Sequence, residues 1–183
     1  MSCNVSGHWL SGSDGGAVIV KLSQDSADVS GTLNPAGEED VMPFKGQLDG
    51  RTLTYDLDMD GKTTFTLNLD DSGMVLDGRW TDGSGDSGGH TMLKVPELAE
   101  TADAGDVSSE WVMLNEGVVT IAKVSQGEDA TTTMELTLDG ESVAWSGKRV
   151  GGTLEFESEE FEVSEDGLIL TNSSYKFLRL KAA

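Results

Sequence analysis

The chain has 183 residues, 37% of them hydrophobic and 25% charged, which suits one ordinary domain or two very small ones. Twelve basic and 33 acidic residues give a formal net charge of −21, a surface that would repel the phosphates of nucleic acid and anionic lipid. We therefore expect no nucleic acid partner and no membrane insertion, whereas a basic protein partner would fit the charge.

The first half of the chain reads as a series of short strands. The clearest segment is 51–59, where Leu53, Tyr55, Leu57 and Met59 alternate with polar residues after the hairpin signal Asp49-Gly50. Similar alternation, with Gly, Ser, Asp and Asn between the segments, predicts strands near 7–11, 17–24, 27–33, 41–48, 51–59, 63–69, 74–80 and 90–95.

An alanine- and acid-rich segment interrupts this pattern at 96–107. It lacks β-branched runs, and one helical turn could begin at Pro96. We interpret it as an acidic linker between a first β unit, 1–95, and a second β unit, 108–183. The strand pattern then restarts near 110–114, 118–125, 131–138, 143–149, 153–157, 161–164, 168–172 and 175–180.

The two halves also align residue by residue, which indicates an internal duplication. A shift of 102 residues pairs Trp9 with Trp111, Lys21 with Lys123, and Ser23-Gln24 with Ser125-Gln126. A shift of 101 residues covers the central hairpin, pairing Gly46, Gly50, Thr52 and Leu53 with Gly147, Gly151, Thr153 and Leu154. Each half is far longer than a solenoid repeat, so two complete units are expected.

The predicted fold class is therefore all-β, with two tandem antiparallel meander units of about eight strands each. Closure into small up-and-down barrels would remove the exposed edges of each meander. Two β-sandwiches, or one sheet shared by both halves, satisfy the same alternation.

The start of the chain resembles that of calycin-type barrels such as lipocalins, fatty-acid-binding proteins and avidins. Gly7-His8-Trp9 matches their G-x-W motif, and the resemblance implies a basic residue packed over the tryptophan, for which Lys94 and Arg179 stand at matching places. The second half departs from the motif, because Ser109-Glu110-Trp111 lacks the glycine. In the alternative interpretation, both tryptophans are large core residues near strand starts.

Three motifs suggest chemistry but fit a structural role better. The run 85–89 matches a serine-protease nucleophile loop, but no suitable histidine and aspartate precede Ser87. The run 56–61 begins like an EF-hand, but its twelfth position is Leu67 and its flanks are strands. The carboxylates of Glu155, Glu157, Glu160 and Glu162 alternate with apolar residues, which places them on outer strand faces rather than in a cleft.

These patterns favour a protein without catalytic activity, cofactor or metal, acting as a binding or interaction module. The preferred role is an accessory or structural subunit of a larger assembly, since the apolar residues are about enough to fill small barrels and no more. The alternatives are a calycin-like carrier of a small apolar ligand, and a carbohydrate-binding or carbohydrate-active domain. A lone cysteine, Cys3, and the lack of a signal peptide or membrane span predict the cytoplasm or another reducing intracellular compartment. The candidate ligand-binding residues are Trp9, Phe44, Tyr55, Trp80, Trp111 and Trp145.

Overall fold

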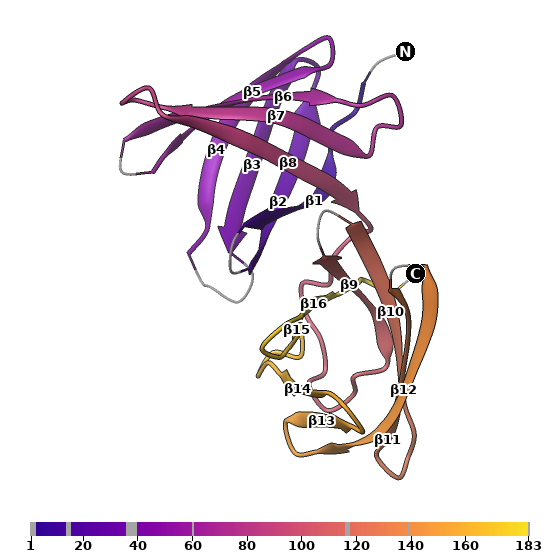
Figure 1. Ribbon diagram of the computed structural model, residues 1–183. Coiled ribbons are helices and arrows are strands. Elements are labelled where there is room, and N and C mark those ends of the chain that lie inside the picture. The colour runs from indigo at the N-terminus through magenta and orange to yellow at the C-terminus, as the bar shows by residue number, and fades with distance from the viewer. Residues whose placement is uncertain are drawn as a thin grey trace. The chain divides into compact units, whose positions relative to one another are not determined.

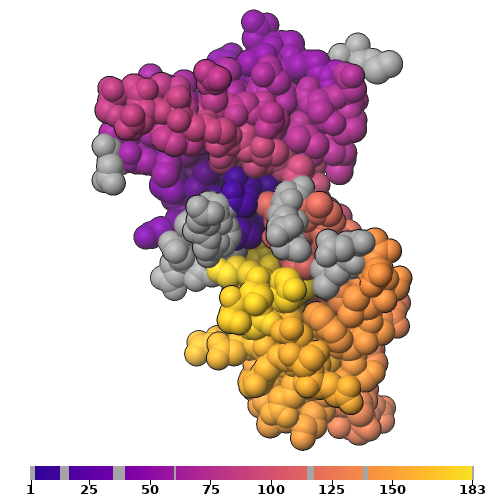
Figure 2. Space-filling view, viewed as in Figure 1, coloured from indigo at the N-terminus to yellow at the C-terminus, as the bar shows by residue number. Residues whose placement is uncertain are grey.

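A computed structural model describes residues 3–13, 16–35, 40–59, 61–115, 118–138 and 140–182. Within these ranges the regular secondary structure consists of strands, which confirms the all-β prediction. No helix of the described residues could cross a membrane. The chain divides into two compact units, Met1–Val95 and Pro96–Ala183, drawn as ribbons in Figure 1 and in space-filling form in Figure 2.

The first unit is a closed antiparallel barrel. Each strand pairs with the next one along the chain, and β8 pairs back onto β1 through the register Trp9↔Lys94. The predicted up-and-down barrel is thus confirmed over the sandwich and the shared sheet. Its strands are β1 (Gly7–Ser13), β2 (Gly16–Asp25), β3 (Asp28–Pro35), β4 (Met42–Asp49), β5 (Thr52–Asp58), β6 (Lys62–Leu69), β7 (Val75–Asp82) and β8 (Ser87–Val95).

The second unit repeats this topology, with β16 pairing back onto β9 through Arg179↔Trp111. Its last four strands are much shorter than their counterparts in the first unit. The strands are β9 (Ser109–Asn115), β10 (Val118–Gln126), β11 (Thr131–Leu138), β12 (Glu141–Val150), β13 (Thr153–Phe156), β14 (Glu160–Val163), β15 (Ile169–Thr171) and β16 (Lys176–Arg179).

The central hairpins form as their sequence predicts. Leu53, Tyr55 and Leu57 of β5 are buried, whereas the residues between them are exposed or half-buried. The turn places Gly50 at a φ of 60°, and Gly151 has a φ of 61° at the equivalent turn of the second unit. Positive φ is strained for residues with a Cβ, so glycine suits both turns.

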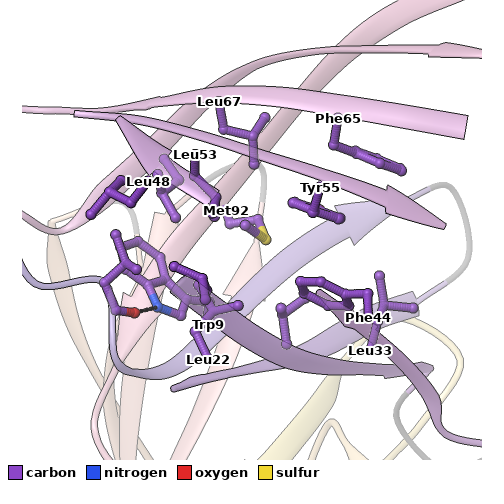
Figure 3. Close-up of a cluster of buried hydrophobic side chains, with 14 of the residues drawn as sticks. Trp9, Leu22, Leu33, Phe44, Leu48, Leu53, Tyr55, Phe65, Leu67 and Met92 are labelled. Carbon is purple, nitrogen blue, oxygen red and sulfur yellow. Dashed lines mark hydrogen bonds between the residues drawn. The ribbon is translucent and has the colours of Figure 1, made fainter. Parts of the chain in front are cut away.

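Each barrel has its own hydrophobic core, built from the inward-facing residues of its strands. The core of the first unit contains Trp9, Phe44, Tyr55 and Phe65, several of which are labelled in Figure 3. The core of the second unit is equally aromatic, with Trp111, Phe156, Phe161, Phe177 and, partly buried, Trp145. Burial of such side chains contributes about 25 cal/mol for each Å² of apolar surface removed from water.

A tryptophan fixes the same corner of both barrels, which supports the internal duplication. Trp9 is fully buried, and its indole N–H donates to the backbone oxygen of Val5 at 2.9 Å. Trp111 is also fully buried and donates to the backbone oxygen of Val107 at 3.1 Å.

A basic side chain lies over each of these indole rings. Lys94 Nζ is 5.4 Å from the ring centroid of Trp9, and the guanidinium carbon of Arg179 is 5.3 Å from that of Trp111. Both distances are within the range of cation–π attraction. The lysine and the arginine therefore take equivalent places in the two barrels.

The segment expected to be a linker contains no helical turn at Pro96, and much of it packs within the second unit. Leu98 forms a β-bridge with Leu180, and Val107 is fully buried in the second core. The acidic segment is therefore part of the second barrel rather than a free connection.

Residues 105–108 take the places that residues 3–6 have in the first unit. The side-chain nitrogen of Gln24 donates to the oxygen of Cys3 at 3.1 Å, and that of Gln126 donates to the oxygen of Gly105 at 3.3 Å. The second barrel thus begins with its own copy of the N-terminal segment, upstream of the boundary expected at 107/108.

Candidate functional site

The two anchoring tryptophans are enclosed in the hydrophobic cores of their barrels. Trp9 and Trp111 are 0% exposed, their indole N–H groups are hydrogen-bonded to backbone, and one face of each ring is covered by a cation. Both are thus large core residues near strand starts, as in the alternative interpretation, and each also lies under a basic residue, as the calycin resemblance implies.

Phe44 and Tyr55 come together at the opposite end of the first core. Their rings stack with centroids 4.3 Å apart, and Tyr55 stacks in turn on Phe65 at 4.8 Å. His90 meets the edge of this row, 5.0 Å from Phe65, and Figure 3 shows the labelled rings of Phe44, Tyr55 and Phe65 near one another. Trp80 pairs with Phe65 in the β6–β7 register and packs, partly buried, on the same core.

Two polar atoms in this aromatic row are buried without a hydrogen-bond partner among the described residues. They are the hydroxyl of Tyr55 and Nε2 of His90. Burial raises the pKa of the Tyr55 phenol and lowers the pKa of His90, so both side chains are held in their neutral forms near neutral pH.

Trp145 lies in the second unit, among rings of that core alone. Its centroid is 6.1 Å from that of Phe156 and 6.0 Å from that of Phe161. Of the six candidate residues, the structure thus brings together Phe44, Tyr55 and Trp80 and leaves the other three in separate packing roles.

A groove opens in the first barrel where β4 and β5 part. Pairing between these strands ends at Gly46↔Tyr55, although β4 begins four residues earlier and β5 continues for three more. At Gly46 the strands approach so closely that an added Cβ would lie 2.6 Å from the oxygen of Thr54 and 2.9 Å from Tyr55 Cβ. Beyond this contact the strands diverge.

We call this opening the β4–β5 groove. It has a volume of about 990 Å³, and most of its surface is apolar. Val41 and Met59, at the strand ends that flank it, are 53% and 48% exposed, which is high for large apolar residues. The groove is lined by Lys21, Leu22, Ser23, Ser30, Gly31, Thr32, Pro43, Phe44, Lys45, Asp56, Leu57, Asp58 and Lys62.

Sequence reasoning identified Phe44 in this lining but missed the three lysines. The alternation of β2 and β4 places Lys21 and Lys45 on the outer face, a signal that was present in the sequence. The parting of β4 from β5 had no such signal, because strand alternation does not tell where pairing stops.

In the first unit, the structure places the side chains of the protease-like motif and of the EF-hand-like motif as follows. Ser87 and His90 are an odd number of residues apart on β8, so their side chains point to opposite faces of the sheet. Asp56 accepts a hydrogen bond from Thr64 at 2.6 Å and pairs with Lys62 at 3.0 Å, and the bond from Thr64 is the main cause of its lowered pKa. Asp60 lies outside the described residues, as do parts of several loops.

Of the four glutamates that the sequence placed on outer strand faces, Glu160 and Glu162 are exposed on β14 and Glu155 is half-buried on β13, whereas Glu157 lies in the bend after β13. Glu155 is opposite Glu160 in the β13–β14 register, and Lys148 is 3.8 Å from Glu155. Within the described ranges, no group of three or more histidine, cysteine, aspartate or glutamate side chains is placed to hold a metal ion.

Comparisons with known proteins give no family. No protein-family model and no curated protein matches the chain. Among solved structures, it is similar to a protein of unknown function from the DUF3598 family of Nostoc punctiforme, at 13% identity and a TM-score of 0.27, covering 97% of this chain and 78% of that one. It is also similar to a Myxococcus xanthus hemagglutinin solved with a mannopentaose, at 13% identity and a TM-score of 0.23, covering 94% and 92%. At these scores neither likeness carries an argument about function.

Proposed function

We propose that the chain is a non-catalytic binding protein whose first barrel takes up a small ligand with an apolar body in the β4–β5 groove. The observation that carries this proposal is the parting of β4 and β5 beside the aromatic row. The groove is about 990 Å³ in volume, within the usual range of small-molecule sites, which are mostly apolar with a few polar groups.

The calycin resemblance belongs to this proposal. In both barrels a tryptophan near the start of the first strand lies under a basic residue of the last strand. A barrel anchored in this way at one end can diverge at the other end without loss of closure. The carrier role is preferred to that of an assembly subunit because the first unit, unlike a barrel filled by its own side chains, has a groove of ligand size.

Calorimetric titration with a neutral amphiphile tests the proposal. The probe is the methyl ester of 11-(dansylamino)undecanoic acid, which has a long apolar body and no carboxylate. We expect saturable binding of one probe per chain. Absence of heat and of any change in dansyl fluorescence would contradict an apolar-body site.

A pair of matched variants locates the binding. Thr32 lies half-buried in the groove wall, and Glu135 of β11 stands at the matching register position of the second barrel. Thr32→Trp therefore places a large side chain in the groove, whereas Glu135→Trp places the same side chain at the matching position of the second barrel. We expect Thr32→Trp to weaken the affinity at least about tenfold, because the added ring takes the volume that the ligand would occupy. Glu135→Trp is expected to leave the affinity unchanged, and equal effects of the two variants would place the ligand elsewhere.

A further inference from the structure

The fourth strand of the second barrel, β12, has a free edge along more than half of its length. On one side it pairs with β11 over residues 141–148. On the other side its pairing with β13 runs only from Val150 to Gly147, which is opposite Phe156, the last residue of β13. β12 extends six residues further, over 141–146, and no described residue of β13 stands opposite this part. Both strands are labelled in Figure 1.

The register shows which backbone groups this edge presents. The N–H of Arg149 donates to the oxygen of Ala130 in the line of β11, at 2.8 Å. Successive residues of an antiparallel strand turn their N–H and C=O groups to opposite sides, so every second residue of β12 from Arg149 back faces β11. Ser142 and Ala144 lie between those residues, and both are exposed. Their N–H and C=O groups therefore point to the free side, as at the edge of an open sheet.

The first barrel has a proline at the corresponding edge. The shift of 101 residues that matches Gly46 with Gly147 also matches Pro43 with Ala144. Proline has no N–H, and proline and lysine on an edge strand are two means by which proteins prevent pairing with another chain. Residues 141–146 contain neither proline nor lysine, and Ala144 retains its donor. The second barrel thus presents an edge that can accept another strand.

Apolar side chains lie beside this edge on the inner face of the sheet. Val143 and Trp145 are half-buried and pack against the second core. Side chains of neighbouring strands that share a face contact one another. A strand added to β12 would therefore cover Val143 and Trp145 if every second side chain of that strand were apolar.

The surroundings of the edge are acidic. Residues 96–183 contain 6 basic and 18 acidic side chains, a formal charge of −12. Of the glutamates at the end of β13, Glu157 and Glu160 are exposed, and Lys148 is 3.8 Å from Glu155. Such a surface attracts a basic segment, whereas a second copy of the chain, with its own charge of −21, is repelled.

One glutamate also stands on the outer face of the sheet next to the edge. Glu135 of β11 is opposite Ala144, and on its other side it is opposite Lys123 of β10. The side chain of Ala144 is small, so a long basic side chain on an added strand can reach across it toward the carboxylate of Glu135. The outer face therefore favours lysine or arginine in the added strand.

We propose that the free edge of β12 binds an extended basic segment of a partner protein as an added strand. The segment pairs with the backbone groups of Ser142 and Ala144, and it alternates basic side chains on the outer face with apolar side chains over Val143 and Trp145. This site involves the second barrel alone and goes beyond the ligand binding proposed for the first.

A fluorescein-labelled peptide of sequence RVRVRVR, with an amidated C-terminus, is the probe for this edge. Fluorescence anisotropy is expected to show saturable binding of one peptide per chain. The peptide EVEVEVE has the same alternation with the opposite charge, and RRRRVVV has the same composition without the alternation. We expect both to bind at least about tenfold more weakly, because one is repelled by the acidic surface and the other cannot place its charges and apolar side chains on opposite faces.

A pair of variants at Ala144 tests the strand pairing itself without changing the charge. Ala144→Pro removes the outward N–H and puts the proline ring in its place, and we expect the affinity for RVRVRVR to fall at least about tenfold. The fold should tolerate this change, because that N–H does not face β11. Ala144→Val keeps the N–H and is expected to change the affinity less than about twofold. Circular dichroism and thermal unfolding check that both variants are folded. On binding, hydrogen exchange should slow at the amides of Ser142 and Ala144.

The outcomes decide between this proposal and its alternatives. Binding of RVRVRVR that Ala144→Pro leaves unchanged would indicate general attraction to the acidic surface, and it would overturn the proposal, as would equal binding of EVEVEVE or no binding at all. Self-association of the free chain in sedimentation, abolished by Ala144→Pro, would assign the edge to a second copy and also overturn it.

Two N-methylated forms of the peptide give a second test on the unaltered protein, which decides the question if Ala144→Pro does not fold. One form carries methyl groups on the amides of its valines and the other on those of its arginines, so each blocks one edge of the added strand. The form whose methyl groups face β12 is expected to bind at least about tenfold more weakly than the other. Equal affinity of the two forms would overturn the strand pairing. Binding of the dansyl ester to the first barrel has no bearing on these results.

Discussion

The two barrels share one topology and one anchored end, but their cores are filled differently at the other end. In the first barrel, Gly31 is opposite Phe44, and the phenyl ring lies over the glycine. In the second barrel, the same place in the register holds Met134 opposite Trp145. Met134 is 0% exposed, so it occupies the space that the first barrel leaves to an aromatic ring.

The strands that follow also differ between the two barrels, in their length. β5 to β8 have 7 to 9 residues, whereas β13 to β16 have 3 or 4. The long strands carry β5 past the end of its pairing with β4 and form one side of the β4–β5 groove. Duplication therefore kept the tryptophan corner in both units, while the last four strands became short in one barrel and stayed long in the barrel that carries the β4–β5 groove.

Truncation of Met134 gives the largest expected effect. Met134→Ala removes three heavy atoms from a fully buried site, and such deletions cost about 2–5 kcal/mol of unfolding free energy. Urea denaturation measures the total loss, and hydrogen exchange of the β9–β16 amides shows whether it falls in the second unit. The neighbouring exposed Thr133 serves as control, with Thr133→Ala expected to change stability by less than about 0.5 kcal/mol. Unaltered exchange in β11 would contradict the packing role of Met134.

An added methyl group at Gly31, the position in the first barrel that matches Met134, tests the packing there by overfilling it. Its Cβ would lie 2.8 Å from Phe44 Cε2 and 2.9 Å from Leu22 Cδ2, so Gly31→Ala is expected to cost about 1–3 kcal/mol through overpacking. Phe44→Leu in the same chain removes the obstructing ring and should recover part of that loss in a double-mutant cycle.

Gly89 provides the control for this substitution. A Cβ there would meet nothing within 4 Å, so Gly89→Ala is expected to change the unfolding free energy by less than about 1 kcal/mol, in either direction. If Gly31→Ala and Gly89→Ala behave alike, or if Phe44→Leu recovers nothing, the ring does not lie where the structure places it.

Strand positions and barrel closure could be predicted from the sequence because they depend on local alternation and on the cost of free edges. Leu53, Tyr55 and Leu57 show the period directly, and Asp49-Gly50 defines the turn before them. The equivalence of Lys94 and Arg179 required only the alignment of the two halves. These features involve near neighbours or repeated residues, which a sequence displays.

The start of the second unit and the position of the groove depend on contacts between residues far apart in the chain, which are hard to recognise from the sequence. Val107-Ser108 repeats Val5-Ser6 at the same shift of 102, so the copied N-terminal segment had a signal, but two residues in an acidic stretch were too few to stand out. The groove had none, because Gly46 and Gly147 both stand at close strand approaches where pairing with the next strand ends, and the two units differ only in how far that next strand continues. Beyond that close approach the two barrels differ in strand length and in distant core residues such as Met134, which neither glycine predicts.

Exchanging tyrosine and phenylalanine at the matching core position of the two barrels gives the smallest expected change in stability and the most direct comparison. Tyr55 and Phe156 occupy the same register position, opposite Gly46 and Gly147, and the hydroxyl of Tyr55 is buried without a partner among the described residues. Because an unsatisfied buried hydroxyl is costly, we expect Tyr55→Phe to raise the unfolding free energy by about 0.5–1 kcal/mol and Phe156→Tyr to lower it by about 1 kcal/mol. Paired urea denaturation curves measure both changes. A loss of stability in Tyr55→Phe would instead mean that a bound water or ligand satisfies the hydroxyl in solution. Titration of that variant with the dansyl ester would separate the two, because the affinity for the probe falls only if the probe itself contacts the hydroxyl.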